Sequence, residues 1–268
     1  MSDKLRADVA LVERGLCDSR VKAQACIMAG QVFVGERKIA KSSELILPED
    51  ELHIKGPAIP FVGRGGLKLE KALKEFGTDV NEKVCMDIGC ATGGFTDVLL
   101  KNGAKHVYAI DVGYGQFDWN LRQDPRVTLM ERTNARNLTG DMFPQQPVVT
   151  VMDVSFISIR LILPVAARIM GEEGVFCTLI KPQFEAGKGN VGKNGVVRDA
   201  AVHEQVIRDI TAFCPTIGWH VEKLSYSPIT GPKGNIEFLA EIRNGIPDDR
   251  DWNAEIHRVV ANAHANLS

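Results

Sequence analysis

The stretch 84–97, VCMDIGCATGGFTD, contains the features of a ligand site built from backbone groups. An apolar run, Val84–Ile88, ends in Gly89, and two further glycines precede an apolar segment with helical spacing. Glycines let backbone N–H groups approach a ligand closely, and the first turn of a helix has unpaired donors. Asp111 ends the next apolar run, about 20 residues on, where a nucleotide site binds ribose hydroxyls. The stretch therefore predicts a site for a cofactor that contains a ribose.

The order of acid and glycines in this turn indicates which cofactor it is. The turn is D-x-G-x-x-x-G-G and differs from the G-x-G-x-x-G of dinucleotide-binding dehydrogenases, which remain the alternative. Asp87, two residues before the first glycine, would repel a pyrophosphate and favour a cation. S-adenosylmethionine carries an ammonium and a sulfonium group, so it is the predicted cofactor. The expected cofactor contacts are Asp87, Gly89, Cys90, Ala91, Thr92, Gly93, Gly94, Phe95 and Asp111.

Strands must alternate with helices to position these residues, and the sequence after residue 66 has that pattern. Near-continuous apolar runs such as VVTVMD and VFCTLIK are typical of a parallel sheet covered on both faces. We predict an α/β fold that resembles the Rossmann-like class I methyltransferases, with a mostly parallel sheet and an antiparallel last strand. Strands are expected over 84–88, 106–111, 127–130, 148–153, 175–181, 220–225 and 235–242, and helices over 67–76, 95–102, 117–122, 158–170, 199–214 and 251–267.

Charged residues stand at the ends of two of these strands. Asp153 ends the fourth strand and Lys181 the fifth, and the carboxyl ends of parallel strands form the ligand-binding edge of an open sheet. Lys68, on the helix that enters the sheet domain, can reach this edge from the side. The resemblance to class I methyltransferases implies that Glu237, near the start of the last strand, faces the same edge. It also implies that Asn134–Ala135 lies beside the adenine of the cofactor.

Two lysines and two carboxylates at one edge could activate a hydroxyl group. A ribose hydroxyl is a poor nucleophile, so it needs a base or a positive environment and an in-line approach to the methyl group. Desolvation and a second ammonium would lower the pKa of a lysine from about 10.4 towards neutrality. We expect Lys181 to activate the hydroxyl, and Asp153, which is also an expected cofactor contact, to position it beside the methyl group of the cofactor. Lys68 and Glu237 would then orient Lys181 and adjust its pKa.

The sequence segments around these four residues resemble those of a known family, the FtsJ-type ribose 2′-O-methyltransferases. The segments that contain Lys68, Asp153, Lys181 and Glu237 are GRGGLKLE, VMDVSFIS, IKPQFEAGKG and GPKGNIEFL, respectively. With ERTNARNL and DVGYGQ, the resemblance extends over all 268 residues to the TlyA family of ribosomal RNA methyltransferases. It implies 2′-O-methylation of cytidine in ribosomal RNA, and the helix over 251–267 implies the subtype that modifies both ribosomal subunits.

Residues 3–55 form a smaller pattern of two short helices and a few short strands. The order Arg6-x-Asp8, Gly15, Ser19-Arg20 and AGQVFVG resembles the ribosomal-protein-S4-like RNA-binding domain, and a solvated charged face is the alternative. We expect an RNA-binding domain over 1–56, a Pro/Gly-rich linker over 57–66 and a methyltransferase domain over 67–268. The expected RNA contacts are Arg6, Ser19, Arg20, Lys22, Gln31, Arg64 and, in a glycine-rich loop that could also be passive, Lys188 and Lys193.

The composition limits the class of protein. Hydrophobic residues make up 44% and charged residues 25%, as in ordinary soluble proteins, and the net charge of −2 means that any basic surface is local. The six cysteines include no Cys-x-x-Cys pair and are expected to be buried and reduced. No apolar run approaches about 18 residues. We expect a cytoplasmic monomer that binds ribosomal RNA or ribosomal subunits, without a membrane or a metal ion.

Two functions of other classes remain open. A ribosome-assembly factor with an inactive methyltransferase fold would not need an intact lysine–carboxylate set, and a pore-forming haemolysin would need a segment able to span a bilayer. Two other kinds of methyltransferase fit less well. Asp153 is followed by Val-Ser-Phe and not by the Pro-Pro-Tyr or Pro-Pro-Phe of amino methyltransferases. Cys177 is expected inside a strand, away from where a 5-methylcytosine enzyme needs its nucleophile.

Overall fold

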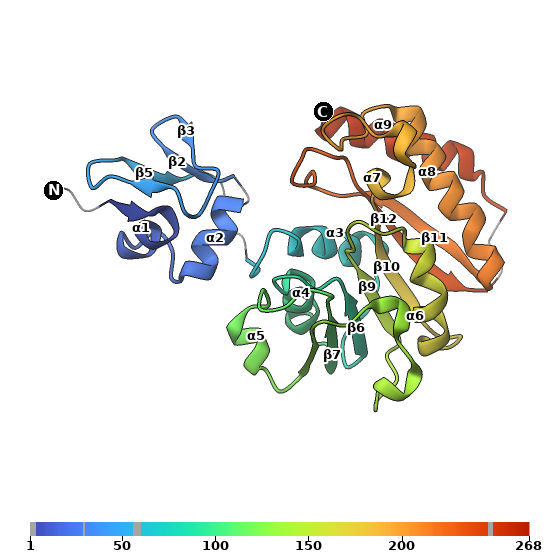
Figure 1. The fold of residues 1–268 in the computed structure, drawn as a ribbon. Coiled ribbons are helices and arrows are strands. Elements are labelled where there is room, and N and C mark those ends of the chain that lie inside the picture. The colour runs from blue at the N-terminus through green and yellow to red at the C-terminus, as the bar shows by residue number, and fades with distance from the viewer. Residues whose placement is uncertain (1–3, 29, 56–59, 246–248, 268) are drawn as a thin grey trace.

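A computed structural model describes residues 4–28, 30–55, 60–245 and 249–267; the side chains of Ala25, Met28 and Lys188 are outside the description. Figure 1 shows a small N-terminal module and a larger α/β unit. Residues 57–59 of the expected linker also lie outside the described residues, whereas 60–65 are described and lead directly into the first helix of the α/β unit.

The N-terminal module packs two short helices on two small sheets around its own apolar core, which includes Leu11, Ile39 and Ile46. Its elements are β1 (Leu5–Arg6), α1 (Ala7–Glu13), α2 (Arg20–Met28), β2 (Val32–Val34), β3 (Arg37–Lys38), β4 (Leu45–Ile46) and β5 (Leu52–Ile54). α1 begins at Ala7, because Arg6 has an extended backbone and pairs with Leu45 of β4.

Seven strands form the sheet of the α/β unit, in the order β11-β12-β10-β9-β6-β7-β8. They are β6 (Val84–Ile88), β7 (His106–Ile110), β8 (Val127–Met130), β9 (Val149–Met152), β10 (Val175–Ile180), β11 (Trp219–Tyr226) and β12 (Phe238–Asn244). β12 runs antiparallel to both of its neighbours, and the remaining pairs are parallel. The predicted sheet with its antiparallel last strand is confirmed, so the ends of β9 and β10 and the start of β12 share one edge.

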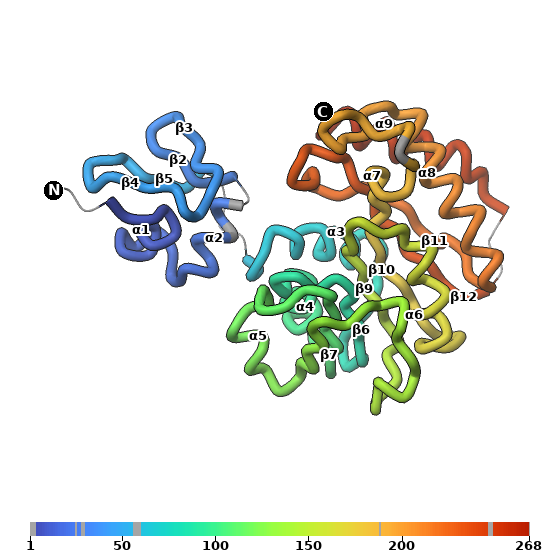
Figure 2. The backbone as a smooth tube through the Cα atoms, viewed as in Figure 1, coloured from blue at the N-terminus to red at the C-terminus, as the bar shows by residue number. Residues whose placement is uncertain are grey.

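Helices cover both faces of the sheet, as the tube in Figure 2 makes visible. An apolar cluster beneath α3 (Gly66–Phe76), α4 (Gly94–Lys101) and α5 (Trp119–Gln123) lies on one face. A second cluster beneath α6 (Leu163–Met170), α8 (Ala200–Phe213) and α9 (Trp252–Leu267) lies on the other. No helix in these described segments is long and apolar enough to cross a membrane. All six cysteines are free and buried.

Two helix boundaries differ from the prediction for local reasons. The helix expected over 158–170 is a 3₁₀ turn, Ile159–Leu161, followed by α6, whose first turn contains Pro164. Proline fixes the backbone and lacks an N–H, so it favours the start of a helix over its interior. α5 begins at Trp119, since the Asp118 carboxylate accepts hydrogen bonds from the amides of Asn120 and Leu121 and caps the helix there.

Candidate active site

The glycine turn brings the loop after β6 against the loop after β9. Gly89 has a φ of +86°, and a Cβ atom there would lie 2.7 Å from the carbonyl oxygen of Asp153. Gly94 begins α4, and a Cβ atom there would lie 3.0 Å from the amide nitrogen of Gly66 on α3. Only glycine permits both approaches, so the turn sets how closely these backbones surround the site.

Replacement of Gly89 by alanine is expected to reduce the free energy of unfolding by about 3 kcal/mol and to weaken binding of S-adenosylmethionine. The added methyl group meets backbone that cannot move aside, and alanine disfavours positive φ. Gly77→Ala is the matched control, because Gly77 also has positive φ (+66°) but no atom lies within 4 Å of the position of an added Cβ. This substitution should reduce the free energy of unfolding by about 1 kcal/mol. Urea unfolding and calorimetric titration measure both effects. Equal losses in the two variants would contradict the packing argument.

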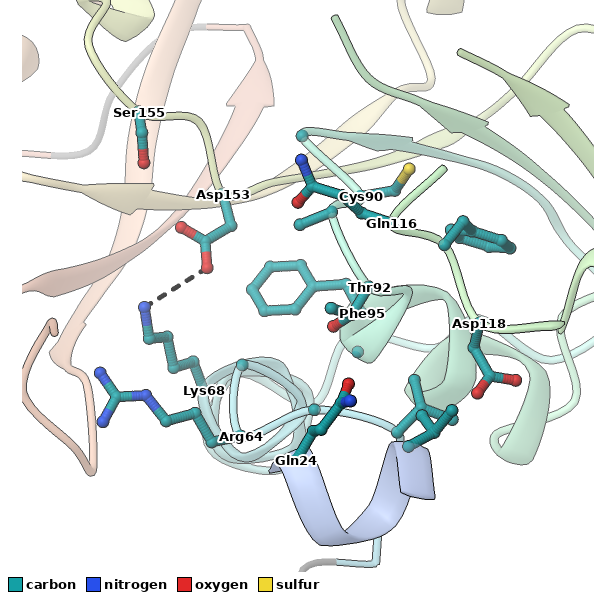
Figure 3. Close-up of a pocket in the computed structure, with 18 of the residues that line it drawn as sticks. Gln24, Arg64, Lys68, Cys90, Thr92, Phe95, Gln116, Asp118, Asp153 and Ser155 are labelled. Atoms are coloured by element: carbon teal, nitrogen blue, oxygen red, sulfur yellow. Dashed lines mark hydrogen bonds and ion pairs between the residues drawn. The ribbon is translucent and has the colours of Figure 1, made fainter. Parts of the chain in front are cut away.

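A cavity of about 790 Å³ opens beside this turn (Figure 3). Its volume lies in the range of about 300–1,000 Å³ that is usual for ligand pockets. The aromatic rings of Phe95 and Phe117 supply apolar wall, while Asp118 and Gln116 supply polar groups, a combination that fits a nucleoside. Further wall residues come from the glycine turn, the loop before α5, the first residue of α5, and α2 of the N-terminal module: Gly89, Cys90, Ala91, Thr92, Gly94, Tyr114, Trp119, Val21 and Gln24.

The remaining predicted cofactor residues lie outside the cavity lining: Asp87, Gly93, Asp111, Asn134 and Ala135. The Asp111 carboxylate accepts hydrogen bonds from the amides of Ala91 (2.9 Å) and Gly113 (2.6 Å), so it stabilises the turn. The Asn134 side chain accepts a hydrogen bond from the amide of Arg136. Direct contact of these residues with a cofactor stays a prediction.

Asp87 is fully buried and accepts a hydrogen bond of 2.7 Å from the Thr96 hydroxyl. Burial raises the pKa of Asp87 to about 7. Below that pH the side chain is mostly neutral, so its attraction for a cationic ligand depends on pH.

Replacement of Asp87 by asparagine should stabilise the protein increasingly as the pH rises. Folding raises the pKa of Asp87 from 3.8 to about 7, so the stability linked to its proton is present at low pH and lost as the pH rises to about 7. Asparagine keeps the acceptor for Thr96 and does not titrate. The excess in free energy of unfolding of Asp87→Asn over the wild-type protein should grow by up to about 1.4 kcal/mol per pH unit between about pH 5 and 7 and then level off. Urea unfolding at several pH values measures it; a gain independent of pH would contradict the assignment.

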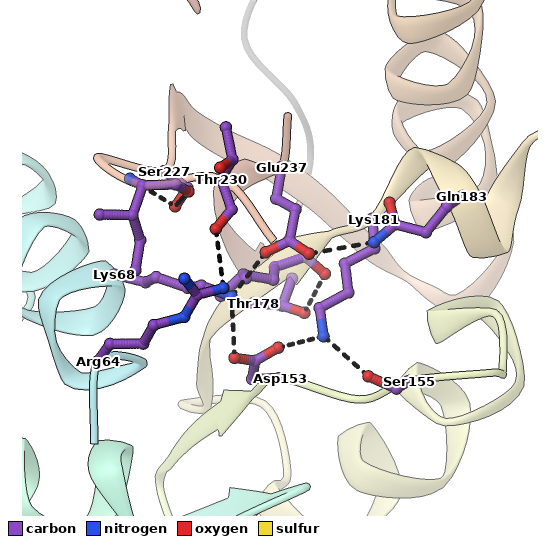
Figure 4. Close-up of polar contacts among 12 residues, drawn as sticks. Arg64, Lys68, Asp153, Ser155, Thr178, Lys181, Gln183, Ser227, Thr230 and Glu237 are labelled. Carbon is purple, nitrogen blue, oxygen red and sulfur yellow. Dashed lines mark hydrogen bonds and ion pairs between the residues drawn. The ribbon is translucent and has the colours of Figure 1, made fainter. Parts of the chain in front are cut away.

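The structure brings the four predicted catalytic residues together at the sheet edge (Figure 4). The ammonium of Lys68 lies 2.6 Å from Glu237 and 3.3 Å from Asp153. The other oxygen of Asp153 lies 2.5 Å from the ammonium of Lys181. Asp153 therefore lies between two ammonium groups, and Lys68 between two carboxylates.

Burial and charge assign different states to these groups. Burial opposes the charge on Lys68, but Asp153 and Glu237 outweigh it and raise the pKa of Lys68 above its ordinary value. Burial likewise opposes the charge on Asp153, but Lys68 and Lys181 outweigh it and lower the pKa of Asp153. Lys68 is thus a permanent cation. Both lysines line the cavity, but Lys181 contacts one carboxylate where Lys68 contacts two.

Two further side chains contact the cluster and are not among the residues predicted from the sequence. The Ser155 hydroxyl accepts a hydrogen bond of 3.1 Å from Lys181. The Gln183 amide donates one of 3.1 Å to Glu237. Both stand two residues after a charged strand-end residue, Asp153 and Lys181 respectively, and that spacing is the signal that could have found them.

The cysteines near the site are poor nucleophiles. Cys177 lies inside β10, its thiol donates to the Thr78 hydroxyl, and burial raises the pKa of Cys177 to about 12. Cys90 lines the cavity, but burial and then Asp87 raise its pKa above the ordinary value. Both thiols stay protonated near neutral pH, which argues against a covalent 5-methylcytosine mechanism. No cluster of His, Cys, Asp and Glu side chains that could bind a metal ion occurs among the described residues.

The predicted RNA-binding residues occupy different settings. Arg6 and Arg20 are partly exposed, and each pairs with the buried Asp8 at 3.0 Å, so they also stabilise the module. Arg64 donates to the carbonyl of Thr230 in the loop that precedes Glu237. The remaining candidates differ in exposure and contacts: Ser19 accepts from the amide of Lys22, Lys22 pairs with Asp18, Gln31 is half-buried, Lys193 is exposed, and the Lys188 side chain lies outside the described residues. Their contact with RNA stays a prediction.

Comparisons with known proteins agree with this architecture. A family model described as "FtsJ-like methyltransferase" matches residues 61–243, and one described as "S4 domain" matches residues 5–52. YqxC of Bacillus subtilis is 49% identical over 99% of this chain and 96% of its own. The Mycobacterium tuberculosis protein named 16S/23S rRNA (cytidine-2′-O)-methyltransferase TlyA is 38% identical over 97% of this chain and 99% of its own. The solved structure "Putative hemolysin from Streptococcus thermophilus" has a TM-score of 0.79 and 45% identity, and covers 99% of this chain and 98% of that one.

Proposed function

Because this chain belongs to the FtsJ-like methyltransferase family, we propose that it transfers a methyl group from S-adenosylmethionine to the 2′-hydroxyl of a cytidine in ribosomal RNA. The observation that carries the proposal is the cluster of Lys68, Asp153, Lys181 and Glu237 beside a nucleoside-sized cavity. The name of the M. tuberculosis relative supports cytidine as the target and both ribosomal subunits as substrates.

The cofactor would lie in the cavity beside the glycine turn, where its sulfonium group supplies an electrophilic methyl. Gly89 and Gly94 allow close backbone approach, and Phe95 and Phe117 offer apolar walls to an adenine. The fit rests on the size and lining of the cavity.

The side chains of the cluster have distinct proposed roles. Lys181 lines the cavity and contacts one carboxylate, whereas Lys68 contacts two, so the conjugate amine of Lys181 would take the proton of the ribose hydroxyl. Asp153 orients Lys181, and Ser155 offers a second acceptor to the same nitrogen. Lys68 remains charged and neutralises part of Asp153, so the negative charge that Lys181 meets is smaller. Orientation of the hydroxyl in line with the methyl–sulfur bond supplies the rest of the acceleration.

The N-terminal module would recruit the RNA. The family match to an S4 domain supports this role, and its separate apolar core supports a division into 1–56, a linker over 57–66, and 67–268. Arg6 and Arg20 keep part of their surface exposed while paired with Asp8, so their guanidinium groups could still reach phosphates.

Methyl transfer to isolated ribosomal subunits tests the proposal. The full-length protein, labelled S-adenosylmethionine and unmodified small and large subunits should yield labelled 2′-O-methylcytidine, identified by mass spectrometry of the digested RNA. Label in N4-methylcytidine or 5-methylcytidine would contradict the assigned acceptor. Subunit binding without label, under conditions in which a known RNA methyltransferase is active, would favour the assembly-factor alternative. Release of haemoglobin from erythrocytes by detergent-free protein would be needed to support a haemolysin.

A further inference from the structure

Gln183 contacts the cluster without belonging to the lysine–carboxylate set. It lies in the first turn of the short helix α7 (Pro182–Glu185), two residues after Lys181. Its amide nitrogen donates a hydrogen bond of 3.1 Å to Oε1 of Glu237, while Oε2 of Glu237 accepts from Lys68. We propose that Gln183 is a positioning residue: its hydrogen bond to Glu237 sets how strongly Lys68 neutralises Asp153, and thereby how readily Lys181 takes a proton. This inference rests on the proposed methyl transfer.

The contacts connect Gln183 to Lys181, which also donates a hydrogen bond to Ser155. Figure 4 shows these contacts running from Gln183 through Glu237, Lys68 and Asp153 to Lys181. Lys68 divides its hydrogen bonds between two carboxylates, at 2.6 Å and 3.3 Å. A donor on the far oxygen of Glu237 weakens the attraction of that carboxylate for Lys68. Lys68 then interacts more with Asp153, and the negative charge that Lys181 meets is smaller.

The surroundings leave Glu237 dependent on Gln183. Glu237 is 1% exposed, and a Cβ atom on Gly231 would lie 2.7 Å from its Oε1, so backbone closes that side. The Gln183 carbonyl oxygen is buried and has no hydrogen-bond partner among the described residues. If the side-chain amide of Gln183 were turned over, its oxygen would face Oε1 of Glu237, and both of these atoms are acceptors. Glu237 therefore fixes the orientation of the Gln183 amide, even though the amide oxygen then has no donor among the described residues.

Two features argue that α7 is a rigid support. Pro182 fixes the backbone at the start of the helix. At its end, the Glu185 carboxylate accepts hydrogen bonds from the Ser158 hydroxyl (2.6 Å) and the amide of Ile159 (2.8 Å). Glu185 is thus directed to the loop after Asp153 and away from Glu237. The other nearby charge, Arg64, is directed to the carbonyl of Thr230, so Lys68, Asp153 and Lys181 are the charged groups coupled to Glu237.

The pH profile of methyl transfer in a Gln183→Leu protein tests the inference. Leucine keeps the volume and removes the donor. We expect the part of the profile in which kcat increases with pH to shift to higher pH by about 0.5–1 unit. At neutral pH, kcat should then fall about 3- to 10-fold, while the KM values for RNA and S-adenosylmethionine stay nearly unchanged. In a Glu237→Gln background the same change should alter kcat less than about twofold, because the carboxylate through which Gln183 acts is absent.

Gln205→Leu is the matched control, since Gln205 also donates to a carboxylate, Asp209, but on the exposed face of α8; its profile should coincide with that of the wild-type protein. Thermal unfolding and calorimetric binding of S-adenosylmethionine establish that each variant is folded. An unshifted profile in Gln183→Leu, or a raised KM for RNA with unchanged kcat, would overturn the inference, the latter by indicating an RNA contact. Absence of methyl transfer by the wild-type protein would instead overturn the proposed function.

Discussion

Replacement of Lys181 by methionine (Lys181→Met) is expected to reduce the rate of methyl transfer by a factor of about 10²–10⁴. Methionine retains the length and the apolar stem of Lys181 but has no group that takes a proton. Binding of S-adenosylmethionine should change less than about twofold, because the glycine turn and the aromatic walls of the cavity are untouched. Single-turnover methylation of ribosomal subunits at saturating cofactor measures the chemical step, and calorimetry measures the binding.

Lys181→Arg separates proton transfer from charge at this position. Arginine keeps the positive charge beside Asp153 and Ser155 but does not release a proton at any accessible pH. If Lys181 acts as a base, the arginine protein should be nearly as inactive as the methionine protein across the pH range. Substantial activity with arginine would mean that the positive charge suffices. Lys74→Met, an exposed lysine on α3, is the control and should retain full activity.

The sequence predicted the catalytic edge because one simple rule of parallel sheets applies to it. Apolar runs identify β9 and β10, and the residues that follow them must emerge at the same edge. Glu237 required more than periodicity, since its position depends on β12 running antiparallel, which came from the family resemblance. The distances among the four side chains, and hence which lysine remains a permanent cation, depend on packing that no spacing in the sequence encodes.

The cofactor residues show where spacing alone is insufficient. Asp111 stands where a ribose contact is expected, yet its two oxygens accept hydrogen bonds from amides of neighbouring loops. Asp87 has the expected position in the turn, but its side chain is directed into the core, towards Thr96. The pattern locates a carboxylate on a strand. Whether that carboxylate meets a ligand or the protein's own donors is decided by loop conformation.

The RNA-binding module illustrates the same point with charge. Arg6 and Arg20 follow the S4 pattern, and the sequence predicts that they face RNA. The structure adds that both share Asp8, which is fully buried and also accepts from Gln24. Burial opposes ionisation of Asp8, but hydrogen bonds from Arg6, Gln24 and Arg20 outweigh it and lower its pKa. Loss of either arginine would therefore affect the folding of the module, whether or not that arginine also contacts RNA.

Replacement of Lys68 by methionine is expected to cause the largest loss of stability at the site, about 3–5 kcal/mol. Lys68 is 5% exposed and supplies the neutralising charge for Glu237, which is 1% exposed. Its removal leaves the buried Glu237 with one neutral donor among the described residues, Gln183. A buried charge that loses its partner retains the full cost of desolvation. Urea unfolding measures the loss, and methylation should fall as well.

A double variant shows whether the loss of stability in Lys68→Met comes from the unpaired charge or from packing. Lys68→Met with Glu237→Gln should recover roughly half of the lost free energy of unfolding, because the second change removes the unpaired carboxylate and keeps its volume. A double variant no more stable than the single one would assign the effect of Lys68 to the packing of its aliphatic stem. If the double variant does recover stability, the ammonium that neutralises the cluster also stabilises the fold, so sequence changes that retain Glu237 must retain Lys68.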